Sequence, residues 1–444
     1  MTFSCELIRD AEKDRLAGHL AASLTELVDV DLLLERILHE ARSIISAEAG
    51  SIYLRRKDKL VLAISQNDYL ERGGMDHNRS ELPFLNYILD INKESLAGYV
   101  TIEKKVLAID NTMEIDPDAP FQHYTAIDNS TNYICEAVIT LPLLCQPEES
   151  MGAIQLINPL DENGAVKGFA DDDVQVLSFY VKSAALALEK AMMLRSMTLR
   201  SVEVISAHDP QETPAHAQRV ACLASELYEH WAKAHMVPSY ERTRILDHLP
   251  LAAMFHDIGK ISVPASILTK PGRLDHQERA LVEGHVLAGA RLFRIHRTPL
   301  DKLTYQVILD HHERWDGQGY PGWVDLDTGL PLKDRSGPDG RARGKRGEEI
   351  SIYGRILAVA DVYDALVSRR SYKDSFDESL SIQIMEQESG RHFDPQVIES
   401  LMARKKVLKR IRDRYPDSME SLELTTDLPL ARAPVAYPLN HPRM

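Results

Sequence analysis

The sequence predicts an α+β domain followed by an all-α domain, with a long helix joining the two. The first part combines helical periodicity with short segments of strand pattern, whereas the second part has helical periodicity and most of the histidines. Between them, apolar residues recur at helical spacing. A chain of 444 residues is long enough for two or three domains of ordinary size. We therefore expect two folded domains.

The first domain is expected to begin with an amphipathic helix and to continue with two β-hairpins. The segment SIYLRRKDKLVLAI is typical of two strands around a charged turn, and AVITLPLL with SMGAIQLINPL predicts a second hairpin across QPEE. The helix is indicated by one apolar stripe, which consists of Leu34, Ile37, Leu38, Ala41, Ile44 and Ile45.

The connecting helix carries apolar residues that step by four and three. This spacing fits a short coiled-coil seam between two copies of the chain, and it equally fits a helix packed on its own domain. Both interpretations stay open at this point. The residues concerned are Leu177, Val181, Ala184, Leu188 and Ala191.

These patterns predict a domain organisation with overlapping boundaries. Prolines and weak periodicity after Arg412 predict a tail that is poorly ordered or lies along the surface. The expected parts are a leader (1–24), the α+β domain (25–190), the connecting helix (177–205), the helical domain (200–405) with an insertion (324–349), and the tail (406–444).

Charge and composition exclude several classes of partner. The formal net charge of -15 disfavours a nucleic-acid polymer or an anionic membrane, because both require a basic face. The four cysteines form no CxxC pair, so neither a disulfide framework nor a zinc ribbon is indicated. The N-terminal residues lack the pattern of a secretory signal, and no apolar run is long enough to span a membrane. We therefore expect a cytoplasmic protein.

The strongest chemical feature is a set of histidines and carboxylates in the second half. His256 and Asp257 follow a stripe of apolar residues at helical spacing and point away from it, with Gly259 available to end the helix. Imidazole is a neutral metal ligand and a carboxylate can bridge two cations, so such a pair suits a dinuclear centre. The further candidates are His216, His285, His311, His312 and Asp361.

The second half resembles the HD-GYP family of cyclic dinucleotide phosphodiesterases over about residues 200–400. The segments HDIGKISVPASILTKPG, HHERWDGQGYP, RILAVADVYDALVSRRSYK and GRHFDP stand in the order of the family. Gly319-Tyr320-Pro321 separates the chain from the wider HD superfamily of nucleotidases. The resemblance implies an all-α HD-superfamily fold and a metal-dependent hydrolase that opens cyclic di-GMP to linear pGpG, and on to GMP in some members.

The resemblance also implies a metal-ligand set. Asp257 is the expected bridge between two metals, and Glu212 is the expected ligand of a third, although an exposed acid on a loop is the alternative for Glu212. Thr213 and Pro214 fit an N-cap and a first helical residue, which would start the helix that carries His216. Two or three divalent ions, iron or manganese, are implied. The full implied set is Glu212, His216, His256, Asp257, His285, His311, His312 and Asp361.

Family positions that contact the substrate are also present. The resemblance gives Asp257 and Lys260 catalytic roles, and Lys260 contacts the substrate phosphate. Arg370 and Lys373 match positions that hold phosphates, where Arg offers a fork and Lys a point charge. Tyr320 is expected to stack on a guanine or to shape the pocket. Ser371 departs from the family, where a Pro is common.

The insertion at 324–349 is a second departure from the family. Its basic run, residues 341–346, lies next to a predicted site for anions. We consider two roles for it: a lid that selects among dinucleotides, and a solvated surface loop.

Residues of about 25–190 resemble a GAF domain. The segments that carry this resemblance are EAGSIYLRRKDKLVL, SLAGYVTIEKKVLAIDNTMEIDP, AVITLPLL and MGAIQLINPLD. The nucleotide-binding motif of some GAF domains is only partly present, as Asn158-Pro159, Phe169 and Asp173, so the small-molecule ligand of this domain is left unnamed. Cys135 and Cys145 lie in apolar strands and are expected to be small hydrophobic residues.

The sequence leaves more than one function open. The first is an enzyme that hydrolyses cyclic di-GMP under control of the GAF sensor, and the second is one that prefers cyclic GMP-AMP. The third is a binding module for a cyclic dinucleotide or a partner protein with little catalysis, which the intact ligand set disfavours. The fourth is an ordinary HD nucleotidase, which the Gly-Tyr-Pro segment disfavours. In each case a parallel homodimer is the expected architecture.

Overall fold

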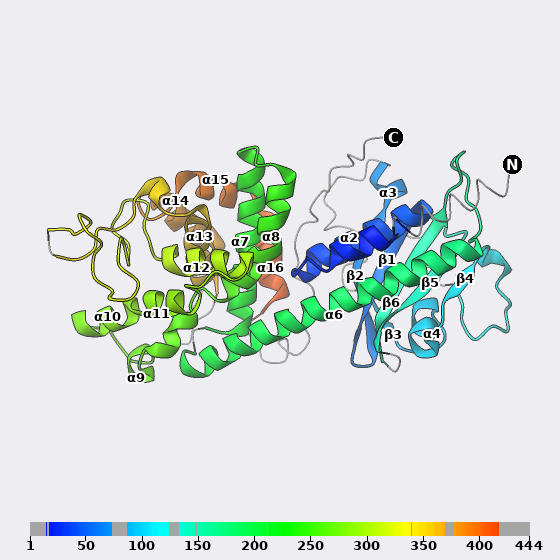
Figure 1. Cartoon of the computed structure of the whole chain (residues 1–444), viewed down its shortest axis with the longest axis horizontal. Coiled ribbons are helices and arrows are strands. Elements are labelled where there is room, and N and C mark those ends of the chain that lie inside the picture. Colours follow the sequence, from blue (N-terminus) through cyan, green and yellow to red (C-terminus); the bar gives the residue numbers. More distant parts are fainter. Residues whose placement is uncertain are drawn as a thin grey trace. The chain divides into compact units, whose positions relative to one another are not determined.

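The structure, a computed structural model, consists of two compact units, residues 1–193 and 194–444. The first unit contains a sheet with helices, and the second is helical (Figure 1). The residues that the structure describes are 15, 17–72, 87–123, 133–146, 149–210, 212–338, 340–368 and 377–416.

The first unit is built on a six-stranded antiparallel sheet with the strand order β3-β2-β1-β6-β5-β4. Both predicted hairpins are confirmed, because β1 pairs with β2 and β5 pairs with β6. Gly152 in β6 faces Leu54, and a Cβ atom there would lie 1.9 Å from the carbonyl oxygen of Tyr53. The strands are β1 (Ala47–Arg56), β2 (Lys59–Asn67), β3 (Ile88–Asp90), β4 (Leu107–Ile109), β5 (Val138–Gln146) and β6 (Glu149–Pro159).

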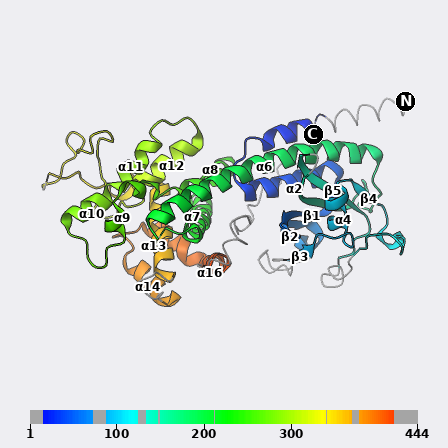
Figure 2. The same ribbon diagram turned by 90° about the horizontal axis from the view of Figure 1, so that it is seen from below.

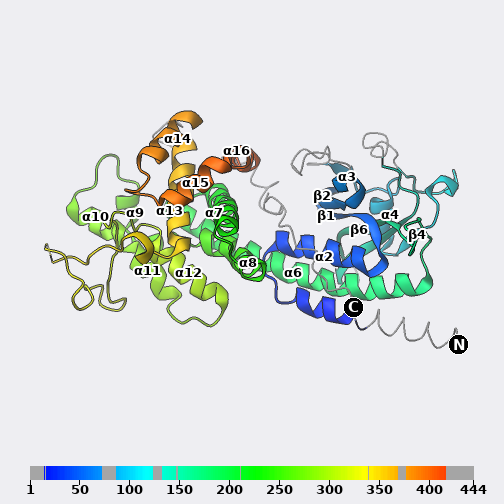
Figure 3. The same ribbon diagram turned by 90° about the horizontal axis from the view of Figure 1, so that it is seen from above.

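Two helices cover one face of this sheet. Helix α2 (Val30–Ile45) confirms the predicted amphipathic helix, and the first part of α6 (Asp171–His208) runs beside it (Figures 2 and 3). Their apolar residues and those of β1, β5 and β6 form the main core of the unit. The hydroxyl of Tyr180 in α6 donates a hydrogen bond of 2.9 Å to Glu40 in α2 and so joins the two helices.

The proposed coiled-coil residues of α6 lie in this core. Leu177, Val181, Ala184, Leu188 and Ala191 are each 2% exposed or less, because they pack against α2 and the sheet. The seam interpretation is therefore wrong for this set of residues, and the alternative of a helix packed on its own domain holds. The expected homodimer stays a prediction.

The opposite face of the sheet carries shorter elements. Helix α4 packs against β5 and β6, and Cys135 is buried there with Leu96 and Val138. Cys135 was expected in a strand but precedes β5, where it packs as a small hydrophobic residue. Cys145 lies in β5, half-buried against the main core, and burial raises the pKa of its thiol to about 12. The short elements of the unit are α3 (Asp68–Arg72), α4 (Leu96–Glu103) and η2 (Thr112–Glu114).

Asn158 holds the end of β6 to the segment that precedes β5. Its side-chain oxygen accepts hydrogen bonds from the backbone amides of Glu136 and Ala137, and its amide nitrogen donates to the carbonyl of Ile134 and the hydroxyl of Tyr133. The residue is 2% exposed and has a φ of 52°. Because its side chain is used within the fold, this part of the GAF motif has a structural role.

The second unit is helical, and among its described residues no named strand occurs. Helix α7 packs against α8 and α13, and α12 packs against α8, α11 and α13. The predicted fold class, an α+β domain followed by an all-α domain with a long helix between them, is confirmed. The helices are α7 (Pro214–Ala234), α8 (Ser239–Met254), η3 (Ile258–Ser262), α9 (Ala265–Leu268), α10 (His276–Glu283), α11 (His285–Leu292), α12 (Pro299–Asp310), η4 (Gly347–Glu349), α13 (Ile352–Val367), α14 (Glu378–Gln387), α15 (Pro395–Ala403) and α16 (Lys405–Arg414).

The insertion at 324–349 is attached to the helical unit at two places. Arg291 of α11 donates hydrogen bonds of 2.7 and 3.1 Å to the carbonyl oxygens of Leu326 and Asp327. Near its other end, the buried Lys345 forms an ion pair with Asp310 at the end of α12. Its role as a lid or a surface loop stays a prediction.

In the part of the chain that the structure describes, no helix has both the length and the apolar character needed to cross a membrane.

Replacing Asn158 with Ala should destabilise the first domain by about 3 kcal/mol, since several buried hydrogen bonds are lost and Ala disfavours a positive φ. Chemical denaturation of the full chain, with hydrogen exchange followed in β5 and β6, measures the effect. Asn163→Ala is the matched control, because Asn163 is exposed and its loss should cost less than about 0.5 kcal/mol. Equal stability of the two variants would contradict this role of Asn158.

Candidate metal centre

The His-Asp pair lies just after a helix. We predicted that His256 and Asp257 sit on a helix that Gly259 ends, but α8 already ends at Met254, and both residues follow in the turn before η3. That prediction was wrong because Gly259 serves a different purpose. A Cβ atom at Gly259 would lie 1.9 Å from the carbonyl oxygen of His285, so glycine is required for the close approach of η3 to α11.

The histidine doublet also follows a helix, because α12 ends at Asp310. Consecutive side chains on a helix would point about 100° apart. Because His311 and His312 lie beyond the helix end, their ring centroids can lie 4.0 Å apart, with an interplanar angle of 41°. Both rings lie near His285, with centroid separations of 5.6 Å for His311 and 5.1 Å for His312.

Three of the predicted ligands are oriented in the same way. The Nδ1 atoms of His256, His285 and His311 lie 2.8, 2.6 and 2.8 Å from the backbone carbonyl oxygen three residues earlier. A carbonyl oxygen only accepts, so Nδ1 of each ring carries the proton, and Nε2 of a neutral ring keeps its lone pair. All three residues are 2% exposed or less. The fold thus presents three buried nitrogen acceptors to one region.

Several of these buried acceptors are unsatisfied. Among the described residues, none forms a hydrogen bond with the Nε2 atoms of His216, His256, His285 and His311 or with Oδ1 of Asp257. Buried polar atoms are nearly always paired, so such a group needs an explanation. Imidazole nitrogens together with a carboxylate are the donor set that binds divalent transition metals, and the residues therefore fit a metal centre.

The ligand atoms form two groups around Asp257. The first group consists of Glu212, His216 and His256. The second consists of Asp257, His285, His311 and His312. In each group the ligand atoms lie within 4.8 Å of one another.

Asp257 faces both groups. Its Oδ1 lies 2.9 Å from Nε2 of His285 and 3.5 Å from Nε2 of His311. Its Oδ2 lies 3.4 Å from Nε2 of His256 in the other group. One carboxylate thus directs an oxygen toward each group, which is the geometry that a bridging ligand requires.

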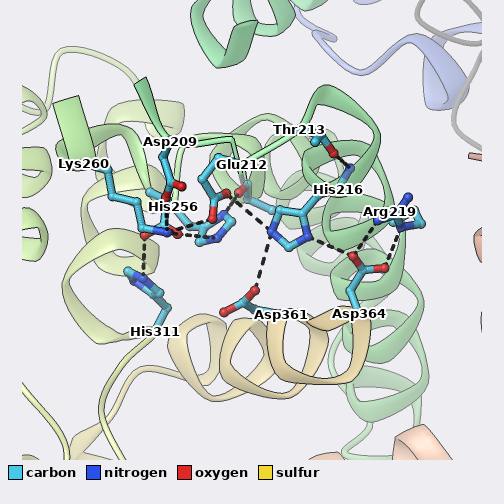
Figure 4. Close-up of polar contacts among 12 residues, drawn as sticks. Asp209, Glu212, Thr213, His216, Arg219, His256, Lys260, His311, Asp361 and Asp364 are labelled. Atoms are coloured by element: carbon cyan, nitrogen blue, oxygen red, sulfur yellow. Dashed lines mark hydrogen bonds and ion pairs between the residues drawn. The ribbon is translucent and has the colours of Figure 1, made fainter. Parts of the chain in front are cut away.

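The first group also involves α7 and α13 (Figure 4). Helix α7 begins at Pro214 with Thr213 as N-cap, as predicted, and the Thr213 hydroxyl accepts from the backbone amide of His216 at 3.1 Å. Nε2 of His216 lies 3.5 Å from Oε2 of Glu212 and 3.6 Å from Oδ1 of Asp361. The structure therefore brings Glu212 and Asp361 to the same imidazole, and Glu212 is buried at 6% exposure rather than exposed on a loop.

Lys260 lies among three carboxylates. Its Nζ is 2.8 Å from Glu212, 2.8 Å from Asp257 and 3.2 Å from Asp209 (Figure 4). Burial alone would lower the pKa of Lys260, but the charges of these carboxylates hold it well above the ordinary value. Lys260 therefore carries a fixed positive charge between the two groups of ligands.

The Gly-Tyr-Pro loop packs directly on the histidine doublet. The ring of Tyr320 stacks on His312 with a centroid distance of 4.7 Å. Gly319 lies against the backbone of Glu313, where a Cβ atom would approach to 2.5 Å. The carboxylate of Glu313 accepts backbone hydrogen bonds from Gly322 and Lys345, at 2.7 and 3.0 Å. Burial raises the pKa of Glu313 to about 7.

Two predicted substrate contacts cannot be located. Arg370 and Lys373, together with Ser371, lie outside the described residues.

Sequence reasoning missed three residues around the predicted ligands. Asp209 contacts Lys260, Glu313 holds the Gly-Tyr-Pro loop, and Asp364 accepts a hydrogen bond of 2.8 Å from Nδ1 of His216. Asp364 had a signal in the sequence, because it follows Asp361 by three residues on one predicted helix and shares its apolar surroundings.

Comparison with known families identifies both domains. A model of the GAF domain matches residues 29–188, and a model of the HD domain matches residues 214–366. The resemblances stated from the sequence, a GAF domain followed by an HD domain, are confirmed. Among solved structures, a GAF domain/HD domain protein from Geobacter sulfurreducens is similar at a TM-score of 0.29 and 18% identity, covering 38% of this chain and 98% of that one.

Curated relatives match the helical part of the chain. A 3'3'-cGAMP-specific phosphodiesterase 2 from Vibrio cholerae is 33% identical over 252 residues, which is 55% of this chain and 42% of the relative. A cyclic di-GMP phosphodiesterase from Thermotoga maritima is 33% identical over 217 residues, which is 49% of this chain and 50% of the relative. The chain thus spans half or less of the length of these relatives.

Replacing His285 with Gln should weaken Mn²⁺ binding by more than about 100-fold, since outer-shell partners alone contribute ten- to 100-fold. Mass spectrometry of metal content after dialysis against limiting Mn²⁺ measures the change. His296→Gln is the matched control, because His296 is exposed and its ring packs on Tyr305. Equal metal content in the two variants would rule His285 out as a ligand.

Metal binding should release about one proton from His256 at pH 7.5. Burial alone would lower the pKa of His256, but the charge of Asp257, whose Oδ2 lies 3.4 Å from Nε2 of His256, raises the pKa to about 10. The metal-free protein therefore holds a protonated imidazole, whose ion pair stabilises the fold fully below pH 6.5 and loses this effect as the pH rises through about 10.

Calorimetric titration with Mn²⁺ in two buffers of different ionisation enthalpy counts the released protons. The apparent affinity should rise between pH 6 and 9, since fewer protons then compete with the metal. His256→Gln should remove the proton attributed to this residue. Proton-free binding by the unmodified protein would refute the assignment.

Proposed function

We propose that this chain, which carries a GAF domain followed by an HD domain, is a metal-dependent cyclic dinucleotide phosphodiesterase of the HD-GYP type. The observation that carries the proposal is the convergence of three unsatisfied imidazole nitrogens, those of His256, His285 and His311, on one side chain, Asp257. Its relatives over the helical domain include phosphodiesterases named for cyclic di-GMP and for cyclic GMP-AMP. Cyclic di-GMP is the substrate that we propose first, and cyclic GMP-AMP is the alternative.

The chemistry of the site fits hydrolysis of a phosphodiester. Two or three divalent ions, iron or manganese, bound by the two groups of ligands would supply Lewis acidity at the scissile phosphate. Glu212, His216, His256 and Asp361 would hold one ion, and His285, His311 and His312 would hold another, with Asp257 between them. Because these imidazoles and carboxylates would be engaged as ligands of the ions, direct attack by water on the phosphate is the reaction that we propose.

Lys260 is proposed to orient the reaction rather than to transfer protons. Its ammonium group stays charged because its pKa is held well above the ordinary value by Asp257 and the neighbouring carboxylates against the effect of burial. A fixed cation beside the bridging carboxylate attracts the phosphate oxygens and offsets the negative charge that gathers on them.

Tyr320 is proposed to shape the site. Its ring is stacked on His312, so its first effect is to fix the orientation of that imidazole. Contact of the tyrosine with a guanine of the substrate is proposed on the strength of the family resemblance. Arg370 and Lys373 are retained as proposed phosphate contacts on the strength of the family resemblance.

The GAF domain is proposed to control the enzyme through α6, in response to a small molecule. Helix α6 begins at Asp171, within the GAF match, and ends at His208. Nε2 of His208 lies 2.6 Å from the carbonyl oxygen of Val263, and the next residue, Asp209, contacts Lys260. The end of the connecting helix is thus joined to the residues of the proposed metal centre.

The purified full chain, loaded anaerobically with Mn²⁺ or Fe²⁺, should convert cyclic di-GMP to linear pGpG, as followed by chromatography. Asp257→Asn should lower the rate by at least about 100-fold. Loss of a residue that only hydrogen-bonds to a metal ligand already costs about ten- to 100-fold in affinity or activity, and loss of a carboxylate that itself binds the metals should cost more. Asp327→Asn is the control, since Asp327 lies on the exposed insertion.

Cyclic GMP-AMP is tested in parallel. Faster hydrolysis of this substrate would support the alternative preference. A protein that binds metal and dinucleotide but hydrolyses neither compound would overturn the catalytic proposal and favour a binding module.

A further inference from the structure

His216 is supported differently from the other buried histidines of the site. The Nδ1 atoms of His256, His285 and His311 each contact a neutral backbone carbonyl of their own turn. The Nδ1 atom of His216 instead lies 2.8 Å from Oδ2 of Asp364, a residue 148 positions later in the chain. One imidazole of the four is therefore held by a negative charge from another helix.

The local structure explains the difference. His216 lies in the first turn of α7, where the N-cap Thr213 stands three residues earlier and uses its hydroxyl to accept from the His216 amide. The other three histidines follow or begin a helix, in places where a carbonyl three residues earlier is within reach. The partner of His216 must therefore come from α13.

Helix α13 provides two carboxylates to the same ring (Figure 4). Oδ1 of Asp361 lies 3.6 Å from Nε2 of His216, and Oδ2 of Asp364 lies 2.8 Å from its Nδ1. The two aspartates are three residues apart and so lie on one face of the helix. Asp361 faces the proposed metal, whereas Asp364 holds the imidazole from behind.

A buried arginine keeps Asp364 charged. Arg219 donates from Nε to Oδ1 at 2.7 Å and from Nη2 to Oδ2 at 3.0 Å, and from Nη1 to the backbone carbonyl of Tyr415 at 2.7 Å. His216, Arg219, Asp364 and Tyr415 are all 4% exposed or less. A two-point ion pair of this kind fixes the carboxylate in position as well as in charge.

We infer that Asp364 is a positioning residue that sets the metal affinity of the group formed by Glu212, His216 and His256. A carboxylate that accepts from Nδ1–H fixes the tautomer and makes Nε2 a stronger donor than a neutral carbonyl does. In the second group, the Nδ1 atoms of His285 and His311 each contact a backbone carbonyl. The metal affinity of the first group therefore depends on the charge of Asp364, which contacts His216. The metal affinity of the second group should not depend on this charge.

This inference rests on one part of the proposed function, namely that both groups of ligands bind divalent ions. It does not depend on hydrolysis of a substrate. Asp364→Asn preserves the size of the side chain and leaves an oxygen that accepts from Nδ1–H, but it removes the charge. We expect Mn²⁺ binding at one of two sites to weaken by about ten- to 100-fold, while the other site is unchanged. Competition with a fluorescent chelator, in the absence of any substrate, measures both affinities in the full chain.

Asp394→Asn is the matched control. Asp394 is a buried aspartate that forms an ion pair of 2.6 Å with Arg355, a residue of α13 like Asp364. Its side chain also accepts from the backbone amide of Gln396, and neither partner is a proposed ligand. This variant loses a comparable buried pair, so its metal affinities should equal those of the unmodified protein even where its unfolding temperature falls.

Arg219→Lys provides a second test in case Asp364→Asn fails to fold. A lysine keeps the positive charge beside Asp364 but loses the two-point contact. The loss of Mn²⁺ affinity should therefore be smaller than in Asp364→Asn and should affect the same metal site. Unchanged affinities in a folded Asp364→Asn protein, or equal weakening of both sites, would overturn the inference. Absence of hydrolysis by the unmodified protein would overturn the proposed function alone, because the binding measurement does not use turnover.

Discussion

The stability of the helical domain depends on how a group of buried acceptor atoms is compensated, because no described residue donates a hydrogen bond to them. Four imidazole nitrogens and one oxygen of Asp257 have no hydrogen-bond partner among the described residues, and each parent residue is 6% exposed or less. An unsatisfied buried polar group costs about 1–3 kcal/mol, and five of them together approach the whole stability of an ordinary domain. Cations or protons must therefore compensate, and Lys260 with the raised pKa of His256 provides part of that compensation in the metal-free protein.

Much of the fold and of the candidate site could be predicted from the sequence, because hydrophobic periodicity and motif order are local properties. The two hairpins, α2 and the cap at Thr213 follow from such patterns. Where the prediction failed, the deciding fact was a contact between distant segments. Gly259 is required by the backbone of His285 rather than by a helix end, and Leu177 and its neighbours in α6 meet α2 rather than a second copy.

The missed residues share the same cause. Asp209, Glu313 and Asp364 act through partners on other elements. Spacing could therefore place Asp364 on the same helix face as Asp361, but it could not reveal which side chains these three acids contact. Glu313 illustrates the point. It stands next to the histidine doublet and would be taken for a ligand, yet both carboxylate oxygens accept backbone hydrogens, from Gly322 and Lys345. Glu313 therefore holds the Gly-Tyr-Pro loop and one end of the insertion next to His311 and His312. With both oxygens used in this way, Glu313 is not a proposed metal ligand.

The same reasoning identifies where a signal would enter the site. Helix α6 is continuous from Asp171 to His208, and a helix transmits a rotation or a shift along its axis to its last residues. At that end, His208 contacts the carbonyl of Val263 and Asp209 contacts Lys260. Under the proposed control through α6, a displacement of the helix end would change the contact between Asp209 and Lys260, and with it the surroundings of the positive charge beside Asp257. Such control would require no movement of the histidines, whose Nδ1 atoms are held by backbone carbonyls or, in His216, by Asp364.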